Sequence, residues 1–319
     1  MESSITCGSG TEIGNFRVRK TFVYLPIVHW NHFIQRPQHV CFQAAKHGYT
    51  VYHVNPRIPG NEVRPTKHKN IYEVLIPNPP YPRGYDILNR DTCADNIRSV
   101  CKLDQCSADD DIIVWCNAPY WEGVFKTFKM WSDAFNKTPY TFVYDILDLF
   151  FEFEDLKPYT KELQKQHKSL VELSECVFVS SKHIGYNTSS ISGIEQDVLT
   201  WLPNACDPVD WVPQINPKSL NKLGYFGTLV EWFDEDAVKE LTNFFVDLIG
   251  HCEPGKSTDH LKYHGPWAYE DLTNIARTWD VGLILFKTYR EIVKGVNPVK
   301  FYEYYAQGLP VVSSRFCGI

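Results

Sequence analysis

The chain has 319 residues, of which 44% are hydrophobic and 22% charged, a composition typical of globular proteins. Its length exceeds the roughly 100 to 200 residues of a single domain and therefore predicts two domains. The formal net charge of −6 argues against nucleic acid as a partner, because that binding needs clustered cations. A small-molecule substrate suits this charge better.

The termini and cysteines indicate where the protein works. The opening sequence MESSITCGSGTEIGNF has no apolar run, and no later segment reaches the roughly 20 apolar residues of a membrane span. We expect a cytoplasmic protein without a membrane span, for which peripheral membrane contact stays open. The 10 cysteines lie far apart, which favours free buried thiols over disulfides. Their spacing matches no zinc pattern, so we expect no metal.

Short apolar runs alternate with helical patterns along the first two thirds of the chain, which is typical of βαβ units around a parallel sheet. Proline in the first turn and glycine at the end mark the helix that begins at Pro37 and stops before Gly48. The expected strands cover 21–28, 49–54, 71–76, 111–115, 141–145 and 176–180, and the expected helices cover 37–47, about 86–103 and 156–173.

A proline-rich stretch at 203–218 resists both helix and central strand and predicts a linker. The expected domains are 1–207 and 208–319. In the second domain the apolar residues of 237–249 keep helical spacing, and Gly250 would stop that helix. The other expected elements are strands at 222–226, 261–264, 281–286 and 309–313 and a helix at about 298–307. Open parallel sheets bind ligands at the carboxyl ends of their strands, so we expect the site in those loops.

The segment from Asn297 to Val312 is the strongest candidate for binding a ligand. A helix that starts near Pro298 and Val299 presents free N–H groups and its positive dipole end, which suits a diphosphate. The carboxylate of Glu303, about one and a half turns into the helix, could accept hydrogen bonds from a ribose. The alternative is an ordinary surface glutamate.

This segment resembles the donor-binding helix of retaining glycosyltransferases of family four, in which a Glu, seven residues and a second Glu precede Gly-x-Pro-Val-Val. Glu303 matches the second Glu, and Gly308-Leu-Pro-Val-Val312 matches the turn and strand. The first Glu falls at Gly295. The phrase as it stands is similar to the Asn-Pro-x-Lys-x-x-Glu-Tyr variant of bacterial-type polysaccharide glycosyltransferases.

Further segments are similar to the same subgroup, in the same order, over nearly the whole chain. His29-Trp30 with Gln35-Arg36-Pro37-Gln38 resembles its Trp-x-Arg-Pro-Gln opening, and 223–234 resembles its second-domain opening. Leu202-Pro-Asn-Ala-Cys-Asp207 resembles its Pro-Asn-Gly-Val-Asp phrase.

The resemblance implies a GT-B architecture, in which two Rossmann-like α/β domains face each other across a cleft. It implies transfer of a sugar from a UDP- or GDP-type donor, with retention, to a glycan, lipid-linked or glycoprotein acceptor, without a metal. The Arg and Lys that neutralise the diphosphate in many relatives fall at Thr228 and Phe233. The second domain also ends sooner than in relatives, and we expect it to be truncated.

Other residues would complete a donor site. Gly227 and Thr228 follow a strand, where glycine lets the backbone approach a pyrophosphate, although glycine there is also ordinary turn chemistry. Lys287 and Lys300 coincide with lysines of the resembling subgroup and would offset the charge of the leaving diphosphate. The segment His264-Gly265-Pro266-Trp267 follows a strand and could supply backbone contacts and an aromatic face for the nucleotide base, although Trp267 could instead be a buried core residue.

In the first domain Arg36 and Trp30 are candidates for the acceptor side, where Arg36 could instead form a surface ion pair. Asp145 and Asp148 follow a strand and could bind an acceptor hydroxyl, with Asp145 the catalytic candidate and Asp148 either an acceptor ligand or a cap.

Two other functions stay open. A nucleotide-sugar epimerase on the same fold would use Asp145 and Asp148 as acid and base. A catalytically inactive partner would explain the missing Glu and the missing Arg and Lys. A redox role has no support, because no Gly-x-Gly-x-x-Gly fingerprint is present.

Overall fold

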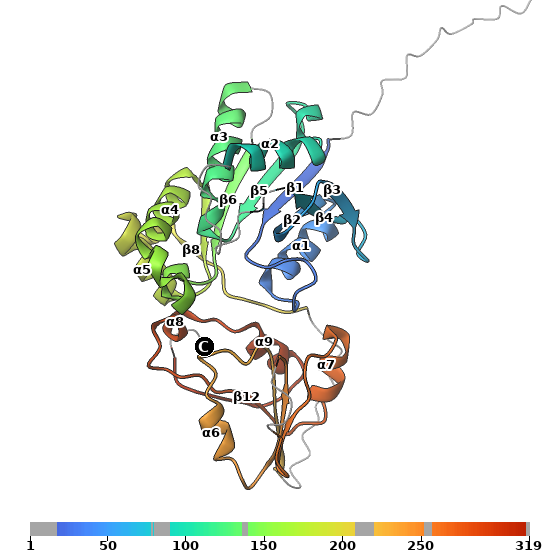
Figure 1. The fold of residues 1–319 in the computed structure, drawn as a ribbon, viewed down its shortest axis with the longest axis vertical. Coiled ribbons are helices and arrows are strands. Elements are labelled where there is room, and N and C mark those ends of the chain that lie inside the picture. The colour runs from blue at the N-terminus through green and yellow to red at the C-terminus, as the bar shows by residue number, and fades with distance from the viewer. Residues whose placement is uncertain are drawn as a thin grey trace, which may run out of the picture.

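The structure, a computed structural model, describes residues 18–77, 79, 90–135, 140–207, 220–251 and 257–316. Two predominantly parallel sheets with flanking helices lie one above the other and form two α/β domains, as the sequence predicts (Figure 1). Most of the predicted linker, at 208–219, lies outside the described residues.

The first sheet has eight strands in the order β3-β4-β2-β1-β5-β6-β7-β8, and only β3 pairs antiparallel. Its strands are β1 (Lys20–Leu25), β2 (Thr50–Pro59), β3 (Glu62–Pro65), β4 (Ile71–Ile76), β5 (Asp111–Cys116), β6 (Tyr140–Ile146), β7 (Cys176–Val179) and β8 (Thr200–Trp201). The helices are α1 (Arg36–Lys46), α2 (Arg90–Val100), α3 (Glu122–Phe135), α4 (Thr160–Leu173) and α5 (Lys182–Ser192).

The second sheet has five parallel strands in the order β11-β10-β9-β12-β13. They are β9 (Lys222–Phe226), β10 (Phe245–Ile249), β11 (Leu261–Tyr263), β12 (Val281–Ile284) and β13 (Val311–Ser313). The helices are α6 (Glu235–Lys239), α7 (Tyr269–Ala276), α8 (Glu291–Gly295) and α9 (Val299–Ala306).

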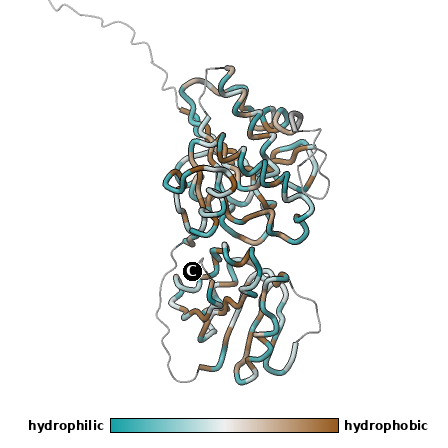
Figure 2. The backbone as a smooth tube through the Cα atoms, turned by 90° about the vertical axis from the view of Figure 1, so that its left-hand side faces the viewer, coloured by the Kyte–Doolittle hydropathy of each residue, from teal (hydrophilic) through white to brown (hydrophobic). Residues whose placement is uncertain are grey.

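Each domain has its own hydrophobic core. The central strands are apolar on both faces because helices cover both, as is usual for parallel sheets. In β1, for example, every residue after Lys20 is buried. Figure 2 shows the more hydrophobic backbone segments running through the middle of each domain. The seven described cysteines are free, and Cys41, Cys93, Cys101 and Cys116 are buried. No helix of the described chain is long and apolar enough to cross a membrane.

The predicted helix over 237–249 is wrong. Only the short α6 forms there, and Phe245–Ile249 is the strand β10 between β9 and β11. The apolar spacing of this segment fits a helix as well as a strand, and pairing with two neighbours decides for the strand. Asp247 in the middle of β10 is held by the indole Nε1 of Trp279 at 3.0 Å and by Lys222 at 2.9 Å.

The other predicted elements agree in type with the structure and differ mainly at their ends. The first strand ends at Leu25 rather than at residue 28, and the predicted helix at 156–173 begins as a 3-10 helix, Glu154–Tyr159, before α4. Part of the predicted helix near 86–103 lies outside the described residues. The sequence patterns do not predict the helices α3, α5, α7 and α8 or the strands β3 and β8.

A candidate active-site cleft between the two sheets

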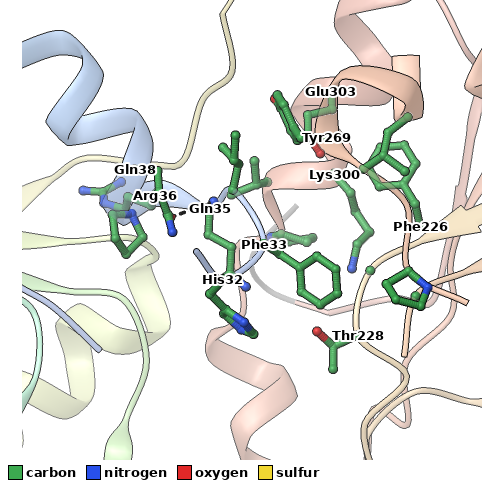
Figure 3. Close-up of a pocket in the computed structure, with 18 of the residues that line it drawn as sticks. His32, Phe33, Gln35, Arg36, Gln38, Phe226, Thr228, Tyr269, Lys300 and Glu303 are labelled. Carbon is green, nitrogen blue, oxygen red and sulfur yellow. Dashed lines mark hydrogen bonds between the residues drawn. The ribbon is translucent and has the colours of Figure 1, made fainter. Parts of the chain in front are cut away.

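A cavity of about 680 Å³ lies between the domains, where the carboxyl ends of the strands of both sheets meet. The first domain contributes residues after β1, in α1 and after β6. The second contributes residues after β9 and β10, before α7 and at the start of α9. Figure 3 shows Phe33 between Arg36 on one side of the cavity and Lys300 on the other. The cavity is the size of a site for a small molecule.

Most of the predicted site residues line this cavity. Those that do are Trp30, Arg36, Asp148, Gly227, Thr228, Pro266, Asn297, Pro298, Val299, Lys300 and Glu303. Those that do not are Asp145, His264, Gly265 and Lys287. The imidazole Nε2 of His264 instead lies 2.7 Å from Asp247 Oδ1.

Two glycine turns and a lysine shape the second-domain side. Gly227 and Gly250 both have positive φ, +140° and +159°, which other residues rarely adopt. A Cβ on Gly250 would lie 1.9 Å from the carbonyl oxygen of Gly227, so the two turns pack backbone against backbone. A Cβ on Gly227 would lie 2.7 Å from Nζ of Lys300. Glycine therefore keeps this ammonium close to the backbone that follows β9.

Lys300 lies in the first turn of α9 and is held without a carboxylate. Its Nζ donates to the hydroxyl of Tyr225 at 3.1 Å and lies 4.5 Å from the centre of that ring. Within the described part of the chain Lys300 has no ion-pair partner. The cavity thus contains an ammonium group that no described carboxylate pairs with, at the amino end of a helix, where the helix dipole is also positive.

Glu303 lies one turn further along α9 and is 8% exposed. Burial raises the pKa of this carboxyl to about 7, although a hydrogen bond from the hydroxyl of Tyr269 and the charge of Lys300 both lower it. Tyr269, at the start of α7, also lines the cavity. This hydrogen bond holds the carboxylate in position. Sequence reasoning did not identify Tyr269, because no local pattern links α7 to α9.

Asn297 joins the start of α9 to the end of the first domain. Its Oδ1 accepts from the backbone N–H of Asn204 at 2.7 Å, and the amide of Asn204 donates to the carbonyl of Asn297. The side chain of Asn297 is buried, with 8% of the residue exposed. The residue predicted to contact a donor therefore also ties the two domains together.

Arg36 and Asp145 form a buried bidentate ion pair in the first domain. Nε and Nη2 of Arg36 donate to the two carboxylate oxygens at 2.9 and 2.7 Å, and the indole Nε1 of Trp115 donates to Oδ2 at 3.2 Å. Asp145 is 0% exposed. The pair raises the pKa of Arg36 although burial alone would lower it.

The other terminal nitrogen of Arg36, Nη1, binds the segment 202–204 at the end of the first domain. It donates to the carbonyl oxygens of Leu202 and Pro203 at 2.8 and 3.1 Å and to Asn204 Oδ1 at 3.3 Å. Asp145 is thus buried and engaged by Arg36 outside the cavity lining, and its predicted catalytic role stays a prediction.

Asp148 faces the cavity and is only partly buried. No described residue hydrogen-bonds to its carboxylate or forms an ion pair with it. Its surroundings remove water, and this desolvation raises its pKa to about 6. Of the two aspartates singled out in the sequence, Asp148 is thus the one able to contact a ligand.

Cations other than Lys300 near the cleft have carboxylate partners or face away. Arg290 lies 3.6 Å from Glu231, and Lys294 pairs with Glu291 in α8. Lys287 is partly exposed outside the cavity. No cluster of three or more His, Cys, Asp or Glu residues suited to a metal ion occurs among the described residues.

The sequence matches no protein-family model and no curated protein. Solved structures match much better. A trehalose-6-phosphate structure from E. coli bound with UDP-2-fluoro glucose has a TM-score of 0.62 at 11% identity, over 94% of this chain and 85% of that one.

The apo lipopolysaccharide outer core galactosyltransferase WaaB has a TM-score of 0.56 at 11% identity, over 93% of this chain and 80% of that one. The catalytic domain of starch synthase IV from Arabidopsis thaliana, bound to ADP and acarbose, has a TM-score of 0.55 at 10% identity, over 83% and 78%. At these identities the likeness concerns the fold, and the chain therefore has the GT-B fold.

Proposed function

We propose that the chain is a glycosyltransferase that moves a sugar from a UDP- or GDP-type nucleotide-sugar donor to a glycan, lipid-linked or glycoprotein acceptor, with retention of configuration. The observation that carries this proposal is the start of α9. Three features border the same interdomain cavity there. They are an ammonium group without an ion-pair partner among the described residues, a helix amino end, and a buried carboxylate one turn on.

Each group has a place in the transfer. Lys300 and the N–H groups of α9 offset the charge that grows on the leaving diphosphate, while Gly227 and Thr228 let the backbone approach it. Glu303 accepts hydrogen bonds from the ribose, and Tyr269 positions it. The donor binds to the second domain, 208–319, and the acceptor to the first, 1–207. Because Lys300 supplies the positive charge, we expect turnover to persist in EDTA.

The epimerase alternative is weaker on geometry. An epimerase would need Asp145 and Asp148 to act on one substrate as acid and base. Asp145, however, is 0% exposed and its two oxygens are engaged by Arg36. Asp148 alone faces the cavity.

Calorimetric titration with UDP, GDP, ADP, dTDP and their common sugars tests the proposal. We expect selective binding of one nucleotide, and Glu303→Ala should weaken it by about tenfold or more, as expected for a lost bond to a charged group. Unchanged affinity would remove Glu303 from the donor site. A folded chain that binds none of these compounds would favour the inactive-partner alternative.

Lys300→Ala separates catalysis from binding. If its charge acts on the departing diphosphate, the variant should lower kcat more than it weakens nucleotide binding. The matched control is Lys294→Ala, which removes an equal charge from α8 outside the cavity. Weaker nucleotide binding with an unchanged kcat in Lys300→Ala would show that Lys300 contributes to ground-state binding only.

A further inference from the structure

The first-domain half of the cavity differs in charge from the half around Lys300. It is formed by the loop after β1, the start of α1, the loop after β3 and the turn after β6. Its cationic side chains, among the described residues that line it, are Arg36 and Lys67. Both have carboxylate partners. Arg36 is bound by Asp145, and Nζ of Lys67 lies 2.5 Å from Glu270 in α7.

Three histidines in this half add little positive charge. Burial lowers the pKa of His32 to about 4, with smaller contributions from the neighbouring His29 and from Arg57. Burial likewise lowers the pKa of His29 and His68. All three are neutral at pH 7. Arg57 is exposed and does not line the cavity, so solvent screens its charge.

The remaining ionisable group in this half is Asp148, whose carboxylate has no partner among the described residues. Because the two ion pairs are each neutral, the carboxylate of Asp148 is the one net charge of the described residues that line the first-domain half of the cavity. Aromatic rings form part of the remaining surface. Trp30 packs edge-on against Phe42, with ring centroids 5.8 Å apart, and both line the cavity together with Phe33.

We infer that this half-site takes the uncharged, hydroxyl-bearing end of a saccharide and rejects phosphorylated acceptors, with Asp148 accepting a hydrogen bond from an acceptor hydroxyl. The inference rests on the proposed transferase function. Apolar faces of a sugar ring pack on aromatic rings, and a carboxylate is a strong acceptor for a hydroxyl. A phosphate in the same space would meet the charge of Asp148 without a free cation beside it.

The size of the discrimination follows from Coulomb's law. A like charge about 6 Å away at an effective dielectric constant near 20 weakens binding about 100-fold, and water in the cleft reduces this to about tenfold. The ion pair of Lys67 with Glu270 is the second electrostatic feature of this half-site. Its partners are 66% and 61% exposed, so the pair is weak, and a phosphate that displaced Glu270 would gain Lys67.

The test uses the full chain saturated with whichever of UDP, GDP or ADP binds most tightly. Tryptophan fluorescence and calorimetry then give the affinities for glucose against glucose 6-phosphate and for maltose against maltose 1-phosphate. We expect the neutral member of each pair to bind about tenfold or more tightly. Dodecyl maltoside below its micellar concentration distinguishes a lipid-linked acceptor from a free glycan. If it binds more tightly than maltose, the acceptor is lipid-linked. If the two bind equally, the acceptor is a free glycan.

Two variants test whether Asp148 causes the preference for neutral over phosphorylated sugars. Asp148→Asn should weaken binding of the neutral sugar and bring the neutral-to-phosphate ratio towards one. The matched control, Asp109→Asn, makes the same change at an exposed position before β5, at the opposite edge of the sheet, and should leave the ratio unchanged.

Three results would overturn the inference while nucleotide binding stands. They are phosphates that bind as well as neutral sugars, no binding of any neutral sugar, or an unchanged ratio in Asp148→Asn. If Lys67→Met abolishes a preference for phosphates, Lys67 and not Asp148 sets the charge of the site. Failure of the proposed function shows itself earlier, as the absence of any nucleotide binding.

Discussion

Replacing Asp145 by Asn separates a structural role of this carboxylate from a catalytic one. In the structure Asp145 is completely buried and compensates the guanidinium of Arg36, which is itself 6% exposed. Removing one partner of a buried pair leaves the other charge without compensation, which costs about 3 to 5 kcal/mol. For a domain of this size each kcal/mol lowers Tm by about 2 to 4 °C, so we expect a fall of roughly 6 to 20 °C.

The measurement is thermal and urea unfolding followed by circular dichroism, with turnover assayed well below Tm. Trp115→Phe is the control, because it removes the 3.2 Å bond from Nε1 to Asp145 but leaves the ion pair with Arg36 intact. It also removes part of the ring packing against Phe22 and Phe178, and we expect it to cost less than Asp145→Asn. The double variant Arg36→Met/Asp145→Leu should be more stable than Asp145→Asn, since it leaves no unpaired charge.

Wild-type stability of Asp145→Asn would contradict a structural role of this carboxylate. An Asp145→Asn protein that is fully stable but has lost turnover by orders of magnitude would restore the catalytic role predicted from the sequence. A stable, inactive Arg36→Met/Asp145→Leu protein would not make that distinction, because Arg36 also holds Leu202 and Asn204.

Further predictions concern the second-domain side. The pKa of Glu303, about 7 because of burial, lies above its ordinary 4.5, so its protonated form stabilises the fold below about pH 4.5 and this stability is lost as the pH rises through 7. Urea unfolding should therefore find Glu303→Gln more stable than wild type at pH 8, by up to roughly 3 kcal/mol, and little different at pH 4. Tyr269→Phe removes a bond that lowers this pKa, so calorimetry should find the pH midpoint of nucleotide binding shifted upward. Gly227→Ala should cost about 1 to 3 kcal/mol for backbone strain at φ +140°, whereas the helical Gly185→Ala, whose Cβ would meet only Val179 at 3.5 Å, should not destabilise in the same unfolding assay.

The alternation of strands and helices was predictable because parallel strands covered on both faces are short, continuous apolar runs. The strands at Ile71–Ile76 and Lys222–Phe226 have the predicted ends for this reason. The same property misleads at 237–249. An apolar run with Asp247 inside it has a helical period, and only its place between β9 and β11, with Lys222 and Trp279 against the carboxylate, makes it a strand.

Part of the candidate site was predictable from local sequence motifs, and part depends on contacts between distant elements. Residues on a local motif, such as Lys300 and Glu303, border the cavity because a helix amino end after a strand of a parallel sheet has to lie at that edge. Pairings between distant elements were not predictable. Asp145 lies inside β6 and Asp148 follows it. The carboxylate of Asp145 is bound by Arg36 from α1, whereas Asp148 lines the cavity.

The glutamate missing from the family pattern has a physical counterpart in the packing of the domains. The pattern places that residue at Gly295, the last residue of α8, which is buried and lies against α5 of the first domain. A Cβ at Gly295 would lie 3.1 Å from Cγ1 of Ile184, closer than ordinary contacts, and the longer side chain of a glutamate would need space that Ile184 fills. The position therefore serves the contact between domains. The carboxylate of α9 that borders the cavity is that of Glu303, and the hydroxyl of Tyr269 donates a hydrogen bond to it.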